Sequence, residues 1–125
     1  MKNIVHQSVG IDISKDSFTC CICKRNDKMS LIFSEVSEFK NEKTGFNRFV
    51  KWVRKQTERG VSVNYVMEAT GVYYEPLAYH LNKLKQDVHV ALPSKVKHYF
   101  KSLNVKTKTD INDARVIARF GVERK

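Results

Sequence analysis

The sequence predicts a single α/β domain, residues 1–125, built on a mixed five-stranded sheet with its elements in the order βββαβαβαα. Residues 7–36 contain three apolar, β-rich runs with only polar turns between them, which is typical of antiparallel strands. Beyond them, helical and strand-like segments alternate, which is typical of parallel strands joined by helical crossovers. A chain of 125 residues is also large enough to bury about two thirds of the surface that it exposes when unfolded.

The first strand is predicted from the apolar run 8–12, which ends at Asp12. Polar turns at 14–16 and 24–28 separate it from two further β-rich runs, so we expect a meander of three antiparallel strands.

The first helix is predicted from apolar residues at helical spacing, with Thr44 as its N-cap and Gly60 just beyond its end. The apolar residues are Phe46, Phe49, Val50 and Val53, and the basic residues of the outer side are Arg48, Lys51, Arg54 and Lys55.

The fourth strand, 63–68, ends at Glu68, and the fifth, 88–92, ends before Pro93. Between them lies a helix with Pro76 in its first turn and one apolar stripe, made of Tyr73, Leu77, Leu81 and Leu84. A third helix follows, burying Val96, Tyr99, Phe100 and Leu103. Residues 104–109 link it to a last helix that Asp110 and Asp113 open. This order of elements is the one expected of a ribonuclease-H-like fold.

The charge of the chain favours a polyanionic partner. Lys and Arg number 23 against 13 Asp and Glu, giving a formal net charge of +10. A soluble domain with surplus lysines is an equally good explanation of the charge alone. Three cysteines, Cys20, Cys21 and Cys23, fit no zinc-binding spacing. With no secretory segment or membrane-spanning run in the sequence, we expect them to be buried thiols of a cytoplasmic protein.

Four carboxylates stand where elements begin or end: Asp12, Glu68, Asp110 and Asp113. Parallel strands with acids at their carboxyl ends bring those acids to one edge of the sheet, where open α/β sheets bind ligands. Asp110 and Asp113 lie one helical turn apart, next to the apolar Ala114 and Ile117. Oxygen ligands of this kind suit magnesium, and bound divalent ions can promote cleavage of a phosphodiester.

Each acid also has a simpler explanation. Asp110 and Asp113 would cap a helix and favour its dipole without any catalytic role. Asp12 would begin a turn, whereas Glu68 at the end of an apolar strand lacks an equally good alternative. The remaining acids are expected to be solvated.

Basic residues precede the last helix and are candidates for contacts with nucleic-acid phosphates: Lys95, Lys97, Lys101, Lys106 and Lys108. A solvated helix face is the alternative for each of them. Tyr73 and Tyr74 follow Glu68, where an aromatic ring can stack on a base, although the helical stripe places Tyr73 in the core.

Three segments, 9–15, 67–73 and 108–114, have the sequences VGIDISK, MEATGVY and KTDINDA. In this order they resemble the DEDD transposases of the insertion-sequence 110 family, whose amino-terminal domain is similar to the Holliday-junction resolvase RuvC. The resemblance implies a RuvC-like transposase domain for DNA transposition and recombination. It also implies that Asp12, Glu68, Asp110 and Asp113 are catalytic residues and ligands of Mg²⁺.

The same resemblance implies DNA as substrate, a structured guide RNA as a further partner and a homo-oligomer for the full-length protein. Family members carry a second, carboxyl-terminal domain with a serine that acts in strand exchange. No serine here matches it, so we expect this chain to be the acidic part of a longer transposase.

Two other functions are open. The chain is a nucleic-acid-binding module if the acids only shape the fold and the chemistry lies in the missing domain. A phosphate-handling domain of the actin and sugar-kinase kind also begins with a strand ending in Gly-Ile-Asp. That class continues with a glycine-bearing turn, whereas Ile13, Ser14 and Lys15 follow here.

Overall fold

The structure is a computed structural model that describes residues 3–69, 71–102 and 113–123. Its strands are β1 (Ile4–Ile13), β2 (Ser17–Asn26), β3 (Leu31–Phe33), β4 (Ser37–Lys40), β5 (Val63–Glu68) and β6 (Asp87–Ala91). Its helices are α1 (Lys43–Gln56), α2 (Glu75–Lys83), α3 (Pro93–Ser102) and α4 (Asp113–Glu123). The described elements follow the predicted order, except that one additional strand precedes α1.

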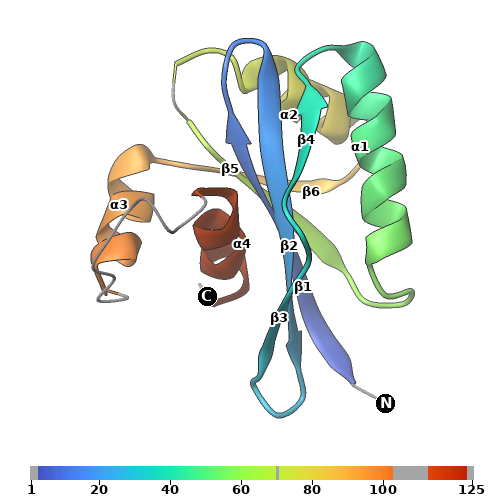
Figure 1. The fold of residues 1–125 in the computed structure, drawn as a ribbon, viewed down its shortest axis with the longest axis vertical. Helices are drawn as coiled ribbons and strands as arrows, with labels where there is room; N and C mark the ends of the chain where they lie inside the picture. The colour runs from blue at the N-terminus through green and yellow to red at the C-terminus, as the bar shows by residue number, and fades with distance from the viewer. Residues whose placement is uncertain (1–2, 70, 103–112, 124–125) are drawn as a thin grey trace.

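The sheet has the strand order β3-β2-β1-β5-β6, and β4 also pairs with β2. The β1–β2 pair is antiparallel, whereas β1–β5 and β5–β6 are parallel, as the alternation of strands and helices predicts. Because β1 and β5 are neighbours, segments more than fifty residues apart in the sequence lie side by side at the centre of the sheet (Figure 1).

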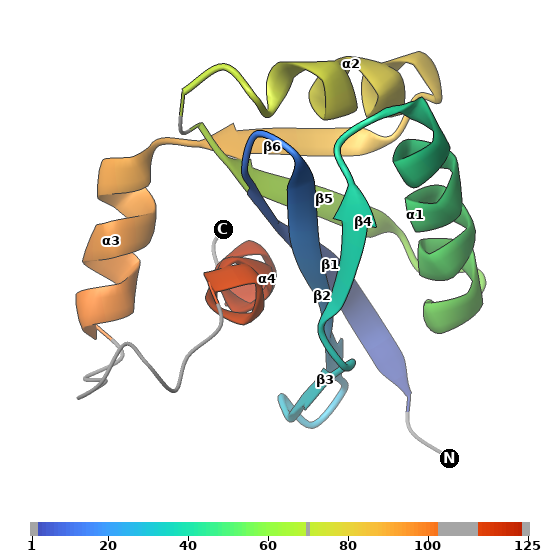
Figure 2. The same ribbon diagram turned by 45° about the horizontal axis from the view of Figure 1, so that its top comes forward.

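Helices cover both faces of the sheet (Figure 2). Buried residues of β1, β2 and β5 pack against α1 and α2 on one face. On the other face, α4 packs over β1, β2 and β5, with α3 beside it. The two layers require each central strand to be apolar on both sides, which explains the near-continuous apolar runs in the sequence.

The predicted third strand is divided in two. Residues of β3 pair with Cys23, Lys24 and Arg25 of β2, whereas β4 pairs with the first four residues of the same strand. Between them the Ser34 hydroxyl accepts a hydrogen bond from the Ile22 backbone N–H at 2.8 Å, so a side chain occupies the place of a strand partner. The sheet therefore has six strands rather than the predicted five.

Several predicted element ends are wrong. Glu42, not Thr44, is the N-cap of α1, and the Thr44 hydroxyl donates to the Glu42 carboxylate at 2.9 Å. Thr57, not Gly60, is the C-cap, because the Thr57 backbone N–H and hydroxyl both donate to the Val53 carbonyl. Gly60 instead occupies a later turn with a φ of +81°.

The apolar stripe of α2 is shorter than predicted. Leu77 and Leu81 are fully buried, but Tyr73 precedes the helix and Leu84 is its C-cap, and both are exposed. On α3 the prediction is confirmed for Val96, which is buried, and for Tyr99, which packs against the same cluster. The Phe100 side chain and residue Leu103 lie outside the described parts of the structure.

Candidate functional site at the carboxyl ends of the central strands

Asp12 and Glu68 occupy equivalent positions on neighbouring parallel strands. Ile11 of β1 is in register with Met67 of β5, and each acid is the next residue on its strand. Neighbouring strands lie about 4.8 Å apart, so the backbones carry the two acids side by side. Both residues are half-buried. The structure therefore brings together the two strand-borne acids that the sequence singles out.

The two carboxylates also belong to the same face of the sheet. Side chains alternate along a strand, and Ile11 and Met67 lie in the core beneath α1 and α2. The residues before and after them must face the opposite way. Val66 confirms this, because it packs against Ile117 and Phe120 of α4. Asp12 and Glu68 thus face the layer that contains α4.

Two glycines bring α4 unusually close to β1. A Cβ atom added at Gly10 would overlap the Ala114 carbonyl oxygen and the Ala118 nitrogen, and one at Gly121 would overlap the Ser8 hydroxyl. The amino-terminal part of α4 is therefore next to Gly10 and its carboxyl-terminal part is next to Ser8. The helix runs opposite to β1, and its first residue lies at the end of the sheet that carries Asp12.

That first residue is Asp113. Its backbone lies at the end of the sheet that carries Asp12 and Glu68, and the buried Ala114 and Ile117 show that the adjoining helix face points to the sheet. Asp110 lies outside the described residues. The described side chains thus include two of the four predicted ligands.

These two carboxylates are chemically suited to a hard divalent cation. They are charged oxygen donors held on rigid strands, as Mg²⁺ prefers. Within the described residues, no group of three or more His, Cys, Asp or Glu side chains is placed to hold a metal ion. A complete magnesium site must therefore draw on ligands beyond Asp12 and Glu68, for which Asp110 and Asp113 are the predicted candidates.

Thr19 is a neighbour of the site that the sequence analysis missed. It is the partner of Asp12 in the β1–β2 register and is half-buried. Directly opposite residues of an antiparallel pair project to the same face, so its hydroxyl borders the candidate site. In the turn between β1 and β2, the Ser14 backbone N–H donates to the Ser17 carbonyl at 2.9 Å, and two residues further along each strand Asp12 pairs with Thr19. The polar turn predicted at 14–16 was the sequence signal that could have identified this pair.

Asn41 joins the two loops that follow the acids. Its side-chain nitrogen lies 3.1 Å from the Ser14 carbonyl oxygen and 3.4 Å from that of Lys15, both just after β1. The same nitrogen donates to the Tyr73 carbonyl at 3.0 Å, in the loop after β5. Because all three partners are carbonyl oxygens, which only accept hydrogen bonds, the Asn41 side-chain atom that faces them must be the amide nitrogen and not the amide oxygen. One side chain thus fixes the distance between the loops that follow Asp12 and Glu68.

Three of the five predicted phosphate-binding lysines lie within the described residues. Lys95, Lys97 and Lys101 are exposed on α3, which begins two residues after β6 and thus at the same end of the sheet as the acids. Lys106 and Lys108 lie outside the described residues. The exposed α3 lysines give the neighbourhood of the acids a positively charged flank.

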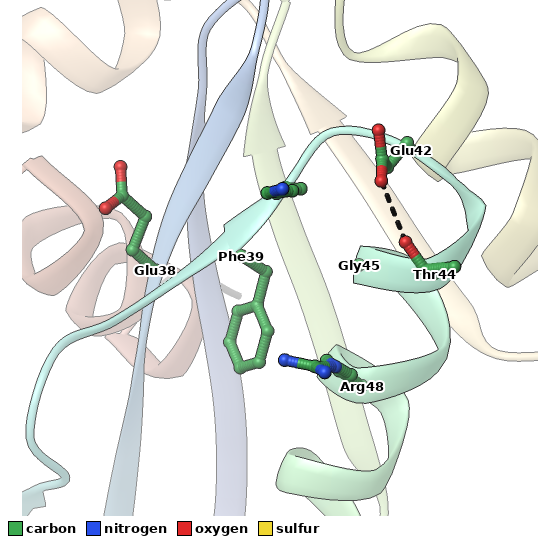
Figure 3. Close-up of a pocket in the computed structure, with 7 residues that line it drawn as sticks. Glu38, Phe39, Glu42, Thr44, Gly45 and Arg48 are labelled. Carbon is green, nitrogen blue, oxygen red and sulfur yellow. Dashed lines mark hydrogen bonds between the residues drawn. The ribbon is translucent and has the colours of Figure 1, made fainter.

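A surface hollow of about 520 Å³ lies between β4 and α1, with its lining shown in Figure 3. Its lining includes Phe39, Arg48 and the Glu42–Thr44 pair. It forms where a Cβ atom on Gly45 would overlap the Lys40 carbonyl. None of the predicted site residues lines it, so this hollow is separate from the candidate site.

The cysteines are buried, as predicted for apolar filling residues. Cys20, Cys21 and Cys23 are free thiols with no solvent exposure. Burial raises the pKa of all three, that of Cys23 to about 12. They are consequently protonated at neutral pH, which suits packing and opposes both metal binding and nucleophilic chemistry.

No helix in the described residues is both long and apolar enough to cross a membrane.

Comparison with known proteins identifies two relatives. The chain is 31% identical over 115 residues to the pilin gene-inverting proteins of Moraxella bovis and Moraxella lacunata. The match covers 92% of this chain but 34% of each relative, so the chain spans about a third of their length.

Two solved structures share the fold. RuvC of T. thermophilus, solved in complex with a Holliday junction substrate, matches 96% of this chain and 81% of its own with a TM-score of 0.57 and 11% identity. The fowlpox virus Holliday junction resolvase matches 93% of both chains with a TM-score of 0.50 and 12% identity. These likenesses confirm the predicted RuvC-like, ribonuclease-H-like fold.

A family profile described as a transposase, of the DEDD type and the insertion-sequence 110 group, matches residues 9–125. The matched region includes all four acids and the three segments that carry the resemblance. The chain therefore belongs to the DEDD transposase family of the insertion-sequence 110 type.

Proposed function

We propose that this chain is the metal-dependent catalytic domain of a DNA transposase or recombinase, with Asp12, Glu68, Asp110 and Asp113 as catalytic residues and Mg²⁺ ligands. The observation that carries the proposal is the convergence of three independent elements. Asp12 and Glu68 are side by side on one face, and α4 begins with Asp113 at the same end of the sheet. Ligands at the carboxyl ends of parallel strands are the usual arrangement in such sheets.

Divalent metal in this position would activate a water molecule and stabilise the leaving oxygen of a phosphodiester. The part played by the chain is to hold the ligands. Asp12 and Glu68 are anchored by strands whose flanking residues, Ile11 and Met67, are completely buried. The strands fix the backbone positions of both acids, which reduces the ordering needed when their carboxylates bind an ion.

DNA is the proposed substrate. The formal net charge of +10 and the exposed lysines of α3 favour a polyanion, and phosphate contacts from lysines position a strand without selecting its sequence. The relatives are described as proteins that invert a pilin gene, which supports a recombination reaction. On the family resemblance we also propose a structured guide RNA and self-association for the longer protein, acting in the cytoplasm.

Titration calorimetry with Mn²⁺ tests the metal site. The wild-type chain should bind the ion, and Asp12→Asn and Glu68→Gln should each weaken binding at least about ten-fold. Asp16→Asn and Glu75→Gln are matched controls, because both residues are exposed and adjoin the same sheet edge. They should bind Mn²⁺ as the wild type does, whereas equal losses in all four variants would contradict a specific site.

The catalytic role of the acids requires a second test, made in a full-length transposase that contains this domain. Asp12→Ala or Asp113→Ala should abolish recombination while leaving the thermal unfolding temperature nearly unchanged. Recombination at the wild-type rate in either variant would overturn the assignment. If the wild-type chain binds no Mn²⁺ but binds DNA with a steep loss of affinity in salt, the alternative of a nucleic-acid-binding module is correct.

A further inference from the structure

Exposed apolar residues lie along the edge of the sheet that carries the acids. Four of the large exposed hydrophobic residues in the described structure lie after β5 or at the end of β6: Val72 and Tyr73 follow β5, Val90 is the penultimate residue of β6, and Leu92 follows that strand. The Ala69 backbone N–H donates to the Ala91 carbonyl at 2.9 Å, which extends the β5–β6 pairing toward the loop that bears Val72 and Tyr73. An apolar rim therefore lies at the edge of the sheet that also carries Asp12 and Glu68.

Tyr73 is the aromatic residue of this rim. The residue is 45% exposed, whereas the adjacent Tyr74 packs against the core beneath α1 and α2. The buried neighbour holds the chain on one side. On the other side, the Asn41 amide nitrogen donates to the Tyr73 carbonyl itself at 3.0 Å. The ring is thus exposed on a backbone that is fixed at two points.

A fixed backbone distinguishes Tyr73 from an ordinary surface tyrosine. The same Asn41 nitrogen contacts the Ser14 carbonyl at 3.1 Å, two residues beyond Asp12 on the neighbouring strand. The position of the Tyr73 backbone is therefore set relative to β1 as well as to β5. The exposed Lys15 follows Ser14 in the same loop. Its carbonyl lies 3.4 Å from the Asn41 nitrogen that binds the Tyr73 carbonyl. An exposed aromatic ring with a lysine in the adjoining loop is a combination that can hold nucleobases by stacking and phosphates by charge.

We propose that the Tyr73 ring stacks on a nucleobase of the DNA strand that enters the acidic site, and that Asn41 positions it there. The proposal rests on the proposed function, since it assigns a substrate contact to the same site. Tyr73 binds substrate, and Asn41 is a positioning residue whose side-chain nitrogen donates to backbone carbonyls of the protein. Every base has a π-face, so the contact tolerates any sequence and selects an unstacked base at this position.

The test uses a single-stranded DNA oligonucleotide with one 2-aminopurine, whose fluorescence is quenched by stacking. With the 125-residue chain, Tyr73→Ala should weaken binding about ten-fold and abolish the quenching, and Tyr73→Phe should preserve both. Tyr79→Ala is the matched control, because Tyr79 is 67% exposed on α2, where Lys83 lies over its ring. This variant should bind and quench as the wild type does.

Asn41→Asp tests the positioning role. It should reduce quenching while the affinity for the oligonucleotide falls less than in Tyr73→Ala, because the ring is present but displaced. Equal affinity and quenching for wild type and Tyr73→Ala would overturn the stacking proposal, as would equal losses in Tyr79→Ala. Mn²⁺ calorimetry on Tyr73→Ala distinguishes failure of the stacking proposal from failure of the proposed metal site. If this variant binds Mn²⁺ as the wild type does, a negative result in the stacking test leaves the metal site unaffected.

Discussion

Gly10 of β1 and Ala114 of α4 meet backbone to backbone, with no space between them for a single methyl group at position 10. This contact fixes how far α4 lies above the sheet. Because Asp12 is two residues after Gly10 and Asp113 is one residue before Ala114, the same contact determines how closely the strand-borne and helix-borne acids can approach. The spacing of the candidate site therefore depends on a glycine that has no chemical role.

Gly10→Ala should destabilise the protein by at least about 2 kcal/mol, because the added methyl overlaps backbone atoms that cannot rotate away. Urea unfolding measures the loss. Gly60→Ala is the control, since no atom lies within 4 Å of a Cβ added there and only the positive φ opposes it, at a cost of about 1 kcal/mol. Equal stability of Gly10→Ala and wild type would show that α4 does not pack as described.

Asn41→Asp should destabilise the protein by about 1–3 kcal/mol, because a carboxylate oxygen would face the carbonyl oxygens that the amide nitrogen now contacts. Faster amide hydrogen exchange should be confined to the loops after β1 and β5. Asn47→Asp, which makes the same change at an exposed position of α1, should be nearly neutral. Equal effects of the two substitutions would contradict the bridging role of Asn41.

Much of this arrangement could be predicted from the sequence, because it follows from local patterns. The apolar runs that end in Asp12 and Glu68 located both strands. The helix between them indicated a crossover connection, which joins parallel strands of one sheet, so the two strands could be expected to lie side by side. The periodicity around Ala114 and Ile117 correctly gave the buried face of α4. The family match then agreed with the three quoted segments.

The rest depends on contacts between distant residues, which no local pattern contains. Asn41 contacts carbonyls 26 to 32 positions away, and neither end of those hydrogen bonds is distinctive in the sequence. The spacing of Tyr73 and Leu77 fits one face of a helix, but α2 begins only at Glu75. Tyr73 therefore lies in the preceding loop and is exposed. The break between β3 and β4 likewise depends on where the Ser34 hydroxyl binds β2.

Stability should fall as the pH rises above about 9. Burial raises the pKa of Cys23 from 9.0 to about 12, and that of Tyr65 from 10.0 to about 12. Each group binds its proton more tightly when folded, so its contribution is complete below the unfolded pKa and is lost as the pH rises toward 12. The urea midpoint should be lower at pH 10.5 than at pH 7.5, with a smaller decrease in Cys23→Ala. An unchanged midpoint would contradict the burial of these groups.

The α3 lysines should contribute to DNA affinity through charge alone. Replacing Lys95, Lys97 or Lys101 by Gln should weaken binding to all DNA sequences about equally and reduce the slope of log K against log salt by about one per contact. Lys28→Gln is the control, because Lys28 is exposed in the turn after β2, at the far end of the sheet from Asp12. A slope that changes as much in Lys28→Gln would show that the α3 lysines have no special part.

The most direct test of the central claim is anomalous diffraction from crystals of the wild-type chain soaked in Mn²⁺. The account predicts an anomalous peak within about 2.5 Å of carboxylate oxygens of both Asp12 and Glu68. It predicts further coordination from the start of α4, and no peak in Asp12→Asn crystals. A fully occupied peak elsewhere, with the Asp12 and Glu68 carboxylates turned away from each other, would contradict it.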